Sequence, residues 1–389
     1  MNTPKIRFKG FKDDWEQRKF EDVGTVAMCK RIFKEQTSEE GEVPFYKIGT
    51  FGGIPDAYIT RELFEEYKKN YQYPNKGDIL ISASGSIGRT VEYTGKDEYY
   101  QDSNIVWLKH ENDLDNSFLK VLYGVIEWSC EGSTIKRLYN DNFLKTEFML
   151  PKIEEQIKIG EYFSKLDHLI TLHQRKCDET KQLKKFMLQK MFPKNGEKNP
   201  EIRFEGFTDA WEQRKLGDVF KEYSEKHHEE LPALTIVQGG GTIFREESDR
   251  SLQYDKSNLS GYKMVKKDDF IVHLRSFEGG LEKANSDGII SPAYHTMHGD
   301  NVDSRFYYPY FRSYDFINRK LVAHVYGIRD GRSIDIDGMK SIEIPYTSYE
   351  EQKTIGDYLD SLDHLITLHQ RKCEKLKELK KYMLHNMFV

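Results

Sequence analysis

Two long stretches of the chain repeat apolar side chains at intervals of three and four residues, the pattern of one face of an α-helix. The stretches from Glu154 to Met191 and from Glu350 to Met387 each hold one glycine and no proline, and Pro193 follows the first stretch. We therefore predict one continuous helix in each stretch. A helix of about 38 residues is ~57 Å long, so each helix needs a partner along its length.

In a heptad count, one stripe of residues along each predicted helix is apolar at both ends and polar in the middle; we call this stripe the seam. This pattern is typical of a coiled coil whose polar positions fix the register, and we expect the two helices to pair antiparallel. The predicted seam consists of Leu166, Leu169, His173, Lys176, Thr180, Leu183, Met187 and Lys190 in the first helix, and of Leu362, Leu365, His369, Lys372, Leu376, Leu379, Met383 and Asn386 in the second.

Outside the helices, short runs of β-branched residues alternate with Gly, Asn and Asp, which indicates strands joined by turns. Residues 73–109 and 262–298 follow one plan: a basic turn with Asp78 or Asp269, an apolar strand, a glycine-containing loop and a second strand. A similar plan with dissimilar side chains indicates two related modules that face different ligands.

Two blocks of sequence occur twice, 196 residues apart. Residues 4–23 match residues 200–219 at 14 of 20 positions, and residues 154–192 match residues 350–388 at 26 of 39 positions, with the run LDHLITLHQRKC unchanged. Two copies are too few for a solenoid. The repeat instead predicts a duplicated frame with two-fold symmetry that holds two different modules in equivalent places.

The composition fits packed domains in a reducing cytosol. The 389 residues are too many for one hydrophobic core, and 13% of them are aromatic. The N-terminus shows no secretory signal, and no apolar run reaches the ~20 residues of a membrane span. The cysteines lack the paired spacing of a zinc or redox site; they are Cys29, Cys130, Cys177 and Cys373.

The motifs of the chain favour binding over catalysis. It contains no G-x-x-x-x-G-K-[ST] phosphate loop, no glycine-rich loop for S-adenosylmethionine and no Asn- or Asp-Pro-Pro-aromatic motif. The histidines of the pairs His168/His173 and His364/His369 are five residues apart. Two metal ligands on one helical face need a spacing of three or four, so we expect no metal site there.

The arrangement of these blocks resembles the specificity (S) subunit of type I restriction-modification systems, the HsdS family. Each variable stretch is entered through WEQRK (15–19 and 211–215) and left through a helix that begins at EEQ (154–156 and 350–352). The segments GDILIS and GSIG in the first stretch also match the style of the family's target-recognition domains. The resemblance covers essentially the whole chain.

The resemblance implies an α+β fold. It consists of two α/β target-recognition domains related by pseudo-two-fold symmetry and separated by two long antiparallel coiled-coil helices. The expected parts are a first target-recognition domain at 1–150, a first frame helix with its linker at 151–195, a second target-recognition domain at 196–345 and a second frame helix at 346–389.

The function implied by the resemblance is DNA recognition without catalysis, in the cytoplasm. Each variable domain would read one half of an interrupted, asymmetric site in double-stranded DNA through the major groove. The helices would set the spacer and dock two methylation subunits, and two restriction/motor subunits would complete the complex. S-adenosylmethionine, ATP and magnesium would be bound by the partner subunits and not by this chain.

Two other classes of protein stay open on the residues alone. An unfamiliar hydrolase with two active sites should repeat its catalytic residues, yet the polar landmarks shared by the variable stretches, such as Asp78 and Asp269, are isolated. A scaffold would bind proteins through the long helices and peptides, or nothing, through the variable modules. Binding of DNA separates the scaffold from the specificity subunit.

Charge restricts where DNA can be contacted. The net charge is −5, and residues 25–150 hold 15 Lys and Arg against 20 Asp and Glu, so cations must gather locally in the loops. Loops beside glycine turns are the expected place, and the run Gly239–Gly241 is expected to be a turn or a close approach to the DNA backbone. The predicted DNA-binding residues are Lys76, Ser84, Ser86, Arg89, Lys136, Arg137, Tyr139 and Asn140 in the first domain, and Lys266, Lys267, His273, Arg275, Ser276, Arg329, Arg332 and Ser333 in the second.

Overall fold

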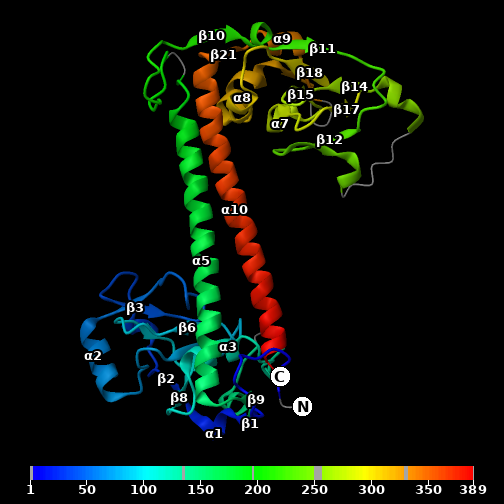
Figure 1. Ribbon diagram of the computed structural model, residues 1–389. Helices are drawn as coiled ribbons and strands as arrows, with labels where there is room; N and C mark the ends of the chain where they lie inside the picture. The colour runs from blue at the N-terminus through cyan, green and yellow to red at the C-terminus, as the bar shows by residue number, and fades with distance from the viewer. Residues whose placement is uncertain (1–2, 134–135, 195–196, 249–255, 328–331, 389) are drawn as a thin grey trace. The chain divides into compact units, whose positions relative to one another are not determined.

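The computed structural model describes residues 3–133, 136–194, 197–248, 256–327 and 332–388 (Figure 1). The chain divides into two compact units, the first made of residues 1–174 and 371–389 and the second of residues 175–370. Each unit combines one variable stretch with one copy of the repeated N-terminal block and with parts of both long helices, α5 (Ile153–Lys190) and α10 (Tyr349–Met387).

The first unit is an α+β module ahead of α5. Its strands are β1 (Glu16–Lys19), β2 (Gly24–Met28), β3 (Val43–Tyr46), β4 (Tyr58–Ile59), β5 (Ile79–Ser82), β6 (Thr90–Glu92), β7 (Tyr99–Tyr100), β8 (Ile105–His110) and β9 (Glu147–Leu150). Its shorter helices are α1 (Phe20–Val23), the 3-10 turn η1 (Lys34–Gln36), α2 (Arg61–Asn70), α3 (Asn116–Tyr123) and α4 (Asn140–Lys145).

The second unit is built in the same order. Its strands are β10 (Glu212–Lys215), β11 (Lys221–Tyr223), β12 (Leu234–Val237), β13 (Gly241–Phe244), β14 (Lys263–Val265), β15 (Phe270–Val272), β16 (Glu282–Lys283), β17 (Gly288–Ile290), β18 (His295–His298), β19 (Val325–Tyr326), β20 (Ser333–Ile334) and β21 (Glu343–Tyr346). Its shorter helices are α6 (Leu216–Val219), η2 (Arg245–Glu247), η3 (Lys256–Gly261), α7 (Ser276–Gly279), α8 (Ser304–Phe311), η4 (Phe316–Lys320), η5 (Leu321–His324) and α9 (Ile336–Lys340).

The two variable stretches share one sheet topology although their sequences differ. The central antiparallel sheet has the strand order β2-β8-β5-β6 in the first unit and β11-β18-β15-β16 in the second. Strands were predicted within 73–109 and 262–298, and the structure confirms them. Asp78 and Asp269 accept hydrogen bonds from the main-chain N–H groups of Asn75 and Lys266, at 2.7 and 3.1 Å, so both hold the turn before the central strand.

The WEQRK segments form a strand that closes each unit. Strand β1 pairs antiparallel with β9, and β10 pairs with β21 in the same register. Since β9 and β21 directly precede the long helices, this pairing holds the repeated N-terminal block against the start of the helix. The sequence repeat did not predict this pairing.

One buried carboxylate joins the N-terminal block to the helix in each unit. In the first, Arg7 donates from Nε and Nη2 to Glu155 at 2.6 and 2.7 Å, and Trp15 Nε1 donates to the same carboxylate at 3.2 Å. Glu155 is 1% exposed. The hydrogen bonds from Arg7 to Glu155 raise the pKa of Arg7. The second unit repeats the cluster with Arg203, Trp211 and Glu351.

The next residue of the EEQ motif ties the helix to the variable stretch. The side-chain amide of Gln156 accepts from the Asp115 N–H at 2.9 Å and donates to the carbonyls of Pro151 and Asp113 at 2.9 and 3.0 Å. Gln352 repeats this by accepting from the Asp303 N–H at 3.0 Å. Because the partners are main-chain groups, the tie does not depend on the side chains of the variable stretch.

The single glycine of each long helix allows a close approach. A Cβ at Gly160 would lie 2.8 Å from the main-chain nitrogen of Phe118, at the start of α3. A Cβ at Gly356 would lie 3.1 Å from Asp303 Oδ1, beside the start of α8. Both helices therefore pack their backbone directly on the helix that follows the central sheet.

The long helices run antiparallel within each unit, as predicted. In each unit a lysine–aspartate ion pair and a cysteine–carbonyl contact join the two helices. From one contact to the next, the residue number rises on one helix and falls on the other, which shows that the helices are antiparallel. The first unit has Lys380–Asp167 at 2.5 Å and Cys373 Sγ–Ile170 O at 4.0 Å. The second has the repeat equivalents Lys184–Asp363 at 2.5 Å and Cys177 Sγ–Ile366 O at 4.0 Å.

The predicted seam is wrong at every second position. Leu169, Leu183, Leu365 and Leu379 are 39–44% exposed, and the seam passes through the residue that follows each of them. Lys176, Lys190, Lys372 and Asn386 are likewise one residue off the seam, which uses Ile, Cys, Lys and Met at these four places of the repeat. The seam consists of Leu166, Ile170, His173, Cys177, Thr180, Lys184, Met187 and Met191, and of Leu362, Ile366, His369, Cys373, Leu376, Lys380, Met383 and Met387.

Cys177 and Cys373 are free thiols, 2% and 4% exposed on this seam, as expected for small packing residues. Among the described residues, no helix is both long enough and apolar enough to cross a lipid bilayer.

The Arg7–Glu155 pair generates a prediction about stability. Arg7→Ala leaves a buried carboxylate without its partner, so we expect it to lower the free energy of unfolding by about 3–5 kcal/mol. Arg18→Ala breaks an exposed pair with Glu16, whose side chains are 46% and 67% exposed, and should cost less than ~1 kcal/mol. Urea unfolding followed by circular dichroism measures both; equal losses would contradict a structural role of the buried pair.

Candidate nucleic-acid interface

Most of the predicted residues of the first unit meet at one end of strand β5. The loop after β5 contains Ser84, and Ser84 forms an isolated antiparallel bridge with Arg137. The N–H of Gly85 donates to the carbonyl of Lys136 at 3.1 Å. Residues 84–89 and 136–140 therefore form one surface, which we call the first loop cluster.

The first loop cluster presents cations and polar groups to solvent. Lys136 and Arg137 are exposed, and their side chains form no hydrogen bond or ion pair with the described residues. Tyr139 is 50% exposed directly before α4, and Asn140 begins that helix. Arg89 is engaged: it donates from Nη2 to the carbonyl of Ile48 at 2.6 Å and lies over the Phe51 ring.

The cluster is held rigid from within. Ser82 Oγ donates to the carbonyl of Ser86 at 2.5 Å and accepts from the N–H of Arg89 at 2.9 Å. Ser84 is only 7% exposed, so it supports the loop, whereas Ser86 is exposed. Lys76 precedes β5 and therefore lies at the opposite end of this strand from the cluster.

The second unit gathers its predicted residues at the equivalent place, after strand β15. Arg332 donates to Glu278 at 3.3 Å, and its guanidinium lies 4.5 Å from the centre of the Phe277 ring. Ser333 begins β20 next to it, and Arg275 caps α7. Residues 273–279 with 332–333 form the second loop cluster.

Two predicted residues of the second cluster are turned inward. Ser276 is 0% exposed, and its hydroxyl accepts from the N–H of His273 at 2.9 Å. Nε2 of His273 is buried and has no hydrogen-bond partner among the described residues. Desolvation lowers the pKa of His273, which favours the neutral imidazole. Both residues therefore support the fold of the loop, and the hydroxyl of Ser276 and Nε2 of His273 point away from solvent.

Three other predicted residues do not join this cluster. Lys266 and Lys267 lie in the turn before β15, at the other end of the strand, like Lys76 in the first unit. Arg329 lies outside the described residues.

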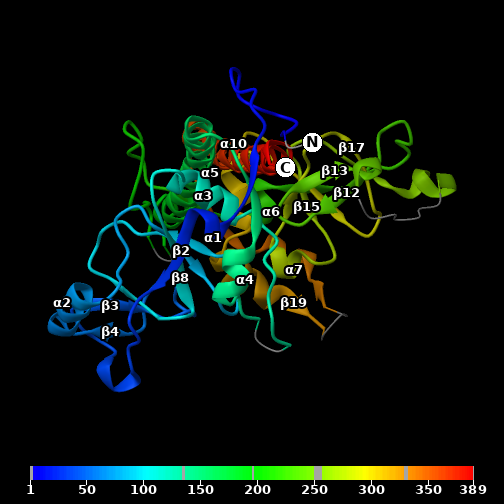
Figure 2. The same cartoon turned by 90° about the horizontal axis from the view of Figure 1, so that it is seen from below.

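The glycine run Gly239–Gly241 forms the turn of the β12–β13 hairpin (Figure 2). Its N–H groups at Gly239 and Gly241 donate to Glu282 at 2.7 and 3.0 Å. Glu282 is 0% exposed and also binds Tyr308 and Arg312. The turn was predicted from sequence but this carboxylate was not, because Glu282 stands beside Lys283 in the two-residue strand β16 and no pattern marks it as buried.

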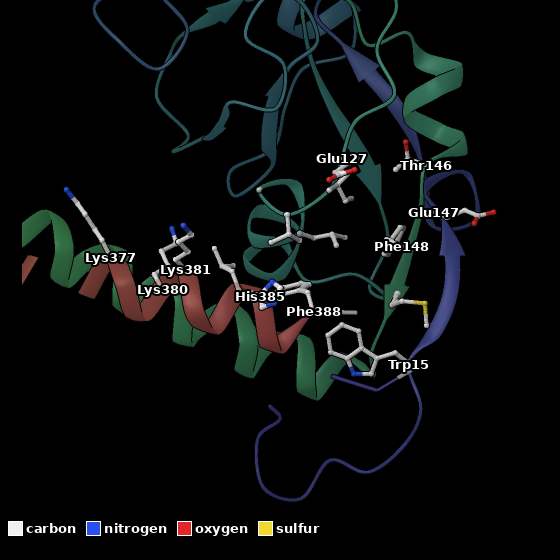
Figure 3. Close-up of a pocket in the computed structure, with 16 residues that line it drawn as sticks. Trp15, Glu127, Thr146, Glu147, Phe148, Lys377, Lys380, Lys381, His385 and Phe388 are labelled. Carbon is white, nitrogen blue, oxygen red and sulfur yellow. The ribbon is translucent and has the colours of Figure 1, made fainter. Parts of the chain in front are cut away.

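The first unit also has an open cavity of about 810 Å³ beside the C-terminal end of α10 (Figure 3). The residues that line it include the aromatic side chains of Trp15, Phe148 and Phe388, the basic side chains of Lys377, Lys381 and His385, and the acidic side chains of Glu127 and Glu147. Another lysine of the lining, Lys380, is paired with Asp167.

The corresponding connection of the second unit is longer and folds differently. The connection between α8 and α9 has 24 residues (312–335), against 16 (124–139) between α3 and α4. The additional turn η4 packs Phe316 against Tyr310 at 5.6 Å between ring centres. It also places Lys320 Nζ 2.7 Å from the carbonyl of Glu343, the repeat equivalent of Glu147 in the cavity wall. The described residues of the shorter connection in the first unit, 124–133 and 136–139, form no such turn.

The described part of the chain contains no group of three or more His, Cys, Asp or Glu side chains arranged to hold a metal ion.

Comparison with known proteins assigns both halves to one family. The model of the type I restriction modification DNA specificity domain matches residues 12–182 and again residues 208–378. The chain belongs to this family. The two matches are offset by 196 residues, the interval of the sequence repeat.

Relatives and a solved structure agree with the assignment. A Haemophilus influenzae protein named as a type I restriction enzyme specificity subunit, S.HindORF215P, is 55% identical over 150 residues, which are 38% of this chain and 39% of that protein. The type I restriction enzyme MjaVIII specificity subunit of Methanocaldococcus jannaschii is 25% identical over 80% of this chain and 75% of its own length. The crystal structure of a type-I restriction-modification S subunit from M. genitalium shares the fold, with a TM-score of 0.61 over 100% of this chain and 99% of that one at 15% identity.

The chain is thus a DNA specificity subunit, the non-catalytic component of a type I restriction-modification system. The α+β fold with two family domains and two packed long helices is confirmed.

Proposed function

We propose that each variable domain of this specificity subunit binds one half of an interrupted, asymmetric DNA site through the major groove. The observation that carries the proposal is the pair of loop clusters. They follow equivalent strands of equivalent sheets, β5 and β15, yet present unrelated side chains. One scaffold with two different surfaces is what two different half-sites require. We place the recognition domains at 1–150 and 196–345 and the frame segments at 151–195 and 346–389.

The chemistry of the clusters fits DNA. Arg137 and Arg332 are exposed guanidinium groups, which pair bidentately with guanine or bind phosphate. Tyr139 and Asn140 add hydrogen-bonding groups beside Arg137. Since the whole chain carries a net charge of −5, much of the phosphate neutralisation falls to partner subunits.

We infer that methylation subunits dock on the flank of the paired helices. Leu169 and Leu379 in the first unit, and Leu183 and Leu365 in the second, are 39–44% exposed. Each of these leucines directly precedes a seam residue, so all four occupy the same heptad position next to the seam. In an antiparallel pair of helices, residues at this position of both helices lie on the same side of the pair. The exposed apolar flank offers a place for a further helix.

The cavity of the first unit extends this docking surface. Its lining combines the aromatic residues Trp15, Phe148 and Phe388 with residues of both charges, among them Lys377, Lys381, Glu127 and Glu147. We infer that it accepts an apolar segment of a methylation subunit.

The complete complex would contain two methylation and two restriction/motor subunits in the cytoplasm. The helices would set the spacer between the half-sites. Methyl transfer from S-adenosylmethionine and ATP- and magnesium-dependent cleavage would take place on the partners.

Exchange of one variable stretch tests the two-reader proposal. Residues 25–150 are replaced by the corresponding stretch of another family member, and DNA from cells that also express the methylation subunit is sequenced for modified bases. We expect one half of the modified motif to change and the other half to stay. A change in both halves, or no modified motif for the parent protein, would contradict it.

Arg137→Ala tests the first loop cluster. We expect it to weaken specific DNA binding of the complex with its methylation subunits by about 1–3 kcal/mol if the guanidinium contacts a base. A uniform loss across sequences would indicate a phosphate contact instead. Lys76→Ala, at the opposite end of β5, is the control and should leave binding unchanged. Titration of labelled DNA measures both, and equal effects would place the interface elsewhere.

Leu169→Ser combined with Leu379→Ser tests the docking flank. Loss of two half-exposed leucines should weaken binding to the methylation subunit by about tenfold or more, with little change in the melting temperature of the free chain. His168→Ser with Glu378→Ser changes exposed helix positions away from this flank and serves as the control. Sedimentation of mixtures measures assembly; unchanged assembly by the leucine variant would exclude this flank.

A further inference from the structure

We propose that Gln238, at the tip of the β12–β13 hairpin, is a further base-contacting residue of the second recognition domain. The inference rests on the proposed DNA-binding function and deepens it: the ligand would be an adenine of the second half-site. Gln238 was not among the residues predicted from sequence.

The hairpin that carries Gln238 is fixed on both sides of its tip. Glu282 accepts from the N–H groups of Gly239 and Gly241 at 2.7 and 3.0 Å. Asn285 Nδ2 donates to the carbonyls of Gly240 and Thr242 at 2.8 and 2.9 Å. A turn held by two side chains of the underlying strand segment presents its tip residue in one defined place.

Glu282 is fixed in turn by the helix behind it. The Tyr308 hydroxyl donates to Glu282 at 2.6 Å, and Arg312 forms an ion pair with the same carboxylate. Burial, together with the hydrogen bond to Glu282, raises the pKa of Tyr308, so the phenol stays protonated and donating. Such a buried and fully paired carboxylate positions the hairpin without itself being exposed.

The side chain of Gln238 lies on the second loop cluster. The nearest atoms that a Cβ at Gly279 would meet all belong to the Gln238 side chain, with Cγ and Cδ at 3.1 Å. Gly279 ends α7, the helix on which Arg332 also packs through Phe277. Gln238 and Arg332 are thus two exposed polar residues that both pack against α7.

The amide of Gln238 is available for a ligand. Gln238 is exposed, and no described residue forms a hydrogen bond with its side chain. Glutamine offers one acceptor and one donor side by side, which match N6 and N7 of adenine in the major groove. An arginine next to it would match guanine. We therefore expect at least one adenine in the half-site bound by the second domain.

Two variants and one control test the assignment in the complex with the methylation subunits. Gln238→Ala removes the amide. Gly279→Ala keeps the amide but displaces it, because the three atoms nearest to the new Cβ all belong to the Gln238 side chain. Gly49→Ala, where a Cβ meets nothing within 4 Å, is the matched control. Modified-base sequencing and DNA titration with single-base variants of the site are the measurements.

Both test variants should accept other bases at one adenine position of the second half-site, with discrimination reduced about five- to a hundredfold. The first half-site should be unaffected, and Gly49→Ala should behave like the parent protein. If Gln238→Ala discriminates between bases as well as the parent protein does, and the parent protein modifies a bipartite motif, the inference about Gln238 is wrong but the proposed function is not. Absence of any motif for the parent would instead overturn the proposed function. Equal melting temperatures of the variants confirm that each is folded.

Discussion

A buried glutamate held by an arginine and a tryptophan is the interaction on which each half of the molecule depends. Glu155 and Glu351 stand in the first turn of the long helices, and both are 1% exposed. A carboxylate is stable in such a place only with a charged partner and further hydrogen bonds. Arg7 and Arg203 supply the charge from a distant part of the sequence, so the ion pair holds the N-terminal block against the first turn of the helix.

The sequence allowed the frame to be predicted because the frame occurs twice. The long helices begin and end within one residue of the predicted positions. The seam could not be placed correctly, since a leucine stripe at 169 and 183 competes with a stripe of Ile170 and Cys177. Burial decides between the two stripes, and burial depends on the partner helix. The leucines that misled the prediction are the exposed residues of the docking flank.

The sequence predicted a candidate interface in glycine-flanked loops after the central strand, because turns at strand ends face solvent, and the structure brings most of the predicted residues of each unit together there. The two ends of the central strand could not be told apart from sequence, so Lys76 and Lys266 were grouped with Arg137 and Arg332, which lie at the opposite end. Contact of any of these residues with DNA stays a prediction. Gln238, which we propose as a further contact, could not be picked out from sequence because its place beside α7 depends on Glu282, 44 residues further along the chain, and on the absence of a side chain at Gly279.

The hydrogen bonds divide into two sets, and this division explains how one frame can hold unlike modules. In the first set, Arg7 and Trp15 both donate to Glu155, and all three residues belong to the repeated blocks. In the second set, the first loop cluster is fixed by Ser82 and the β12–β13 hairpin by Glu282, each from inside its own variable stretch. Where the two sets meet, Gln156 and Gln352 bind main-chain groups of the variable stretch. Main-chain groups are present whatever side chains the variable stretch carries. A replaced variable stretch therefore brings its own loop supports with it and meets the frame through groups that every such stretch possesses.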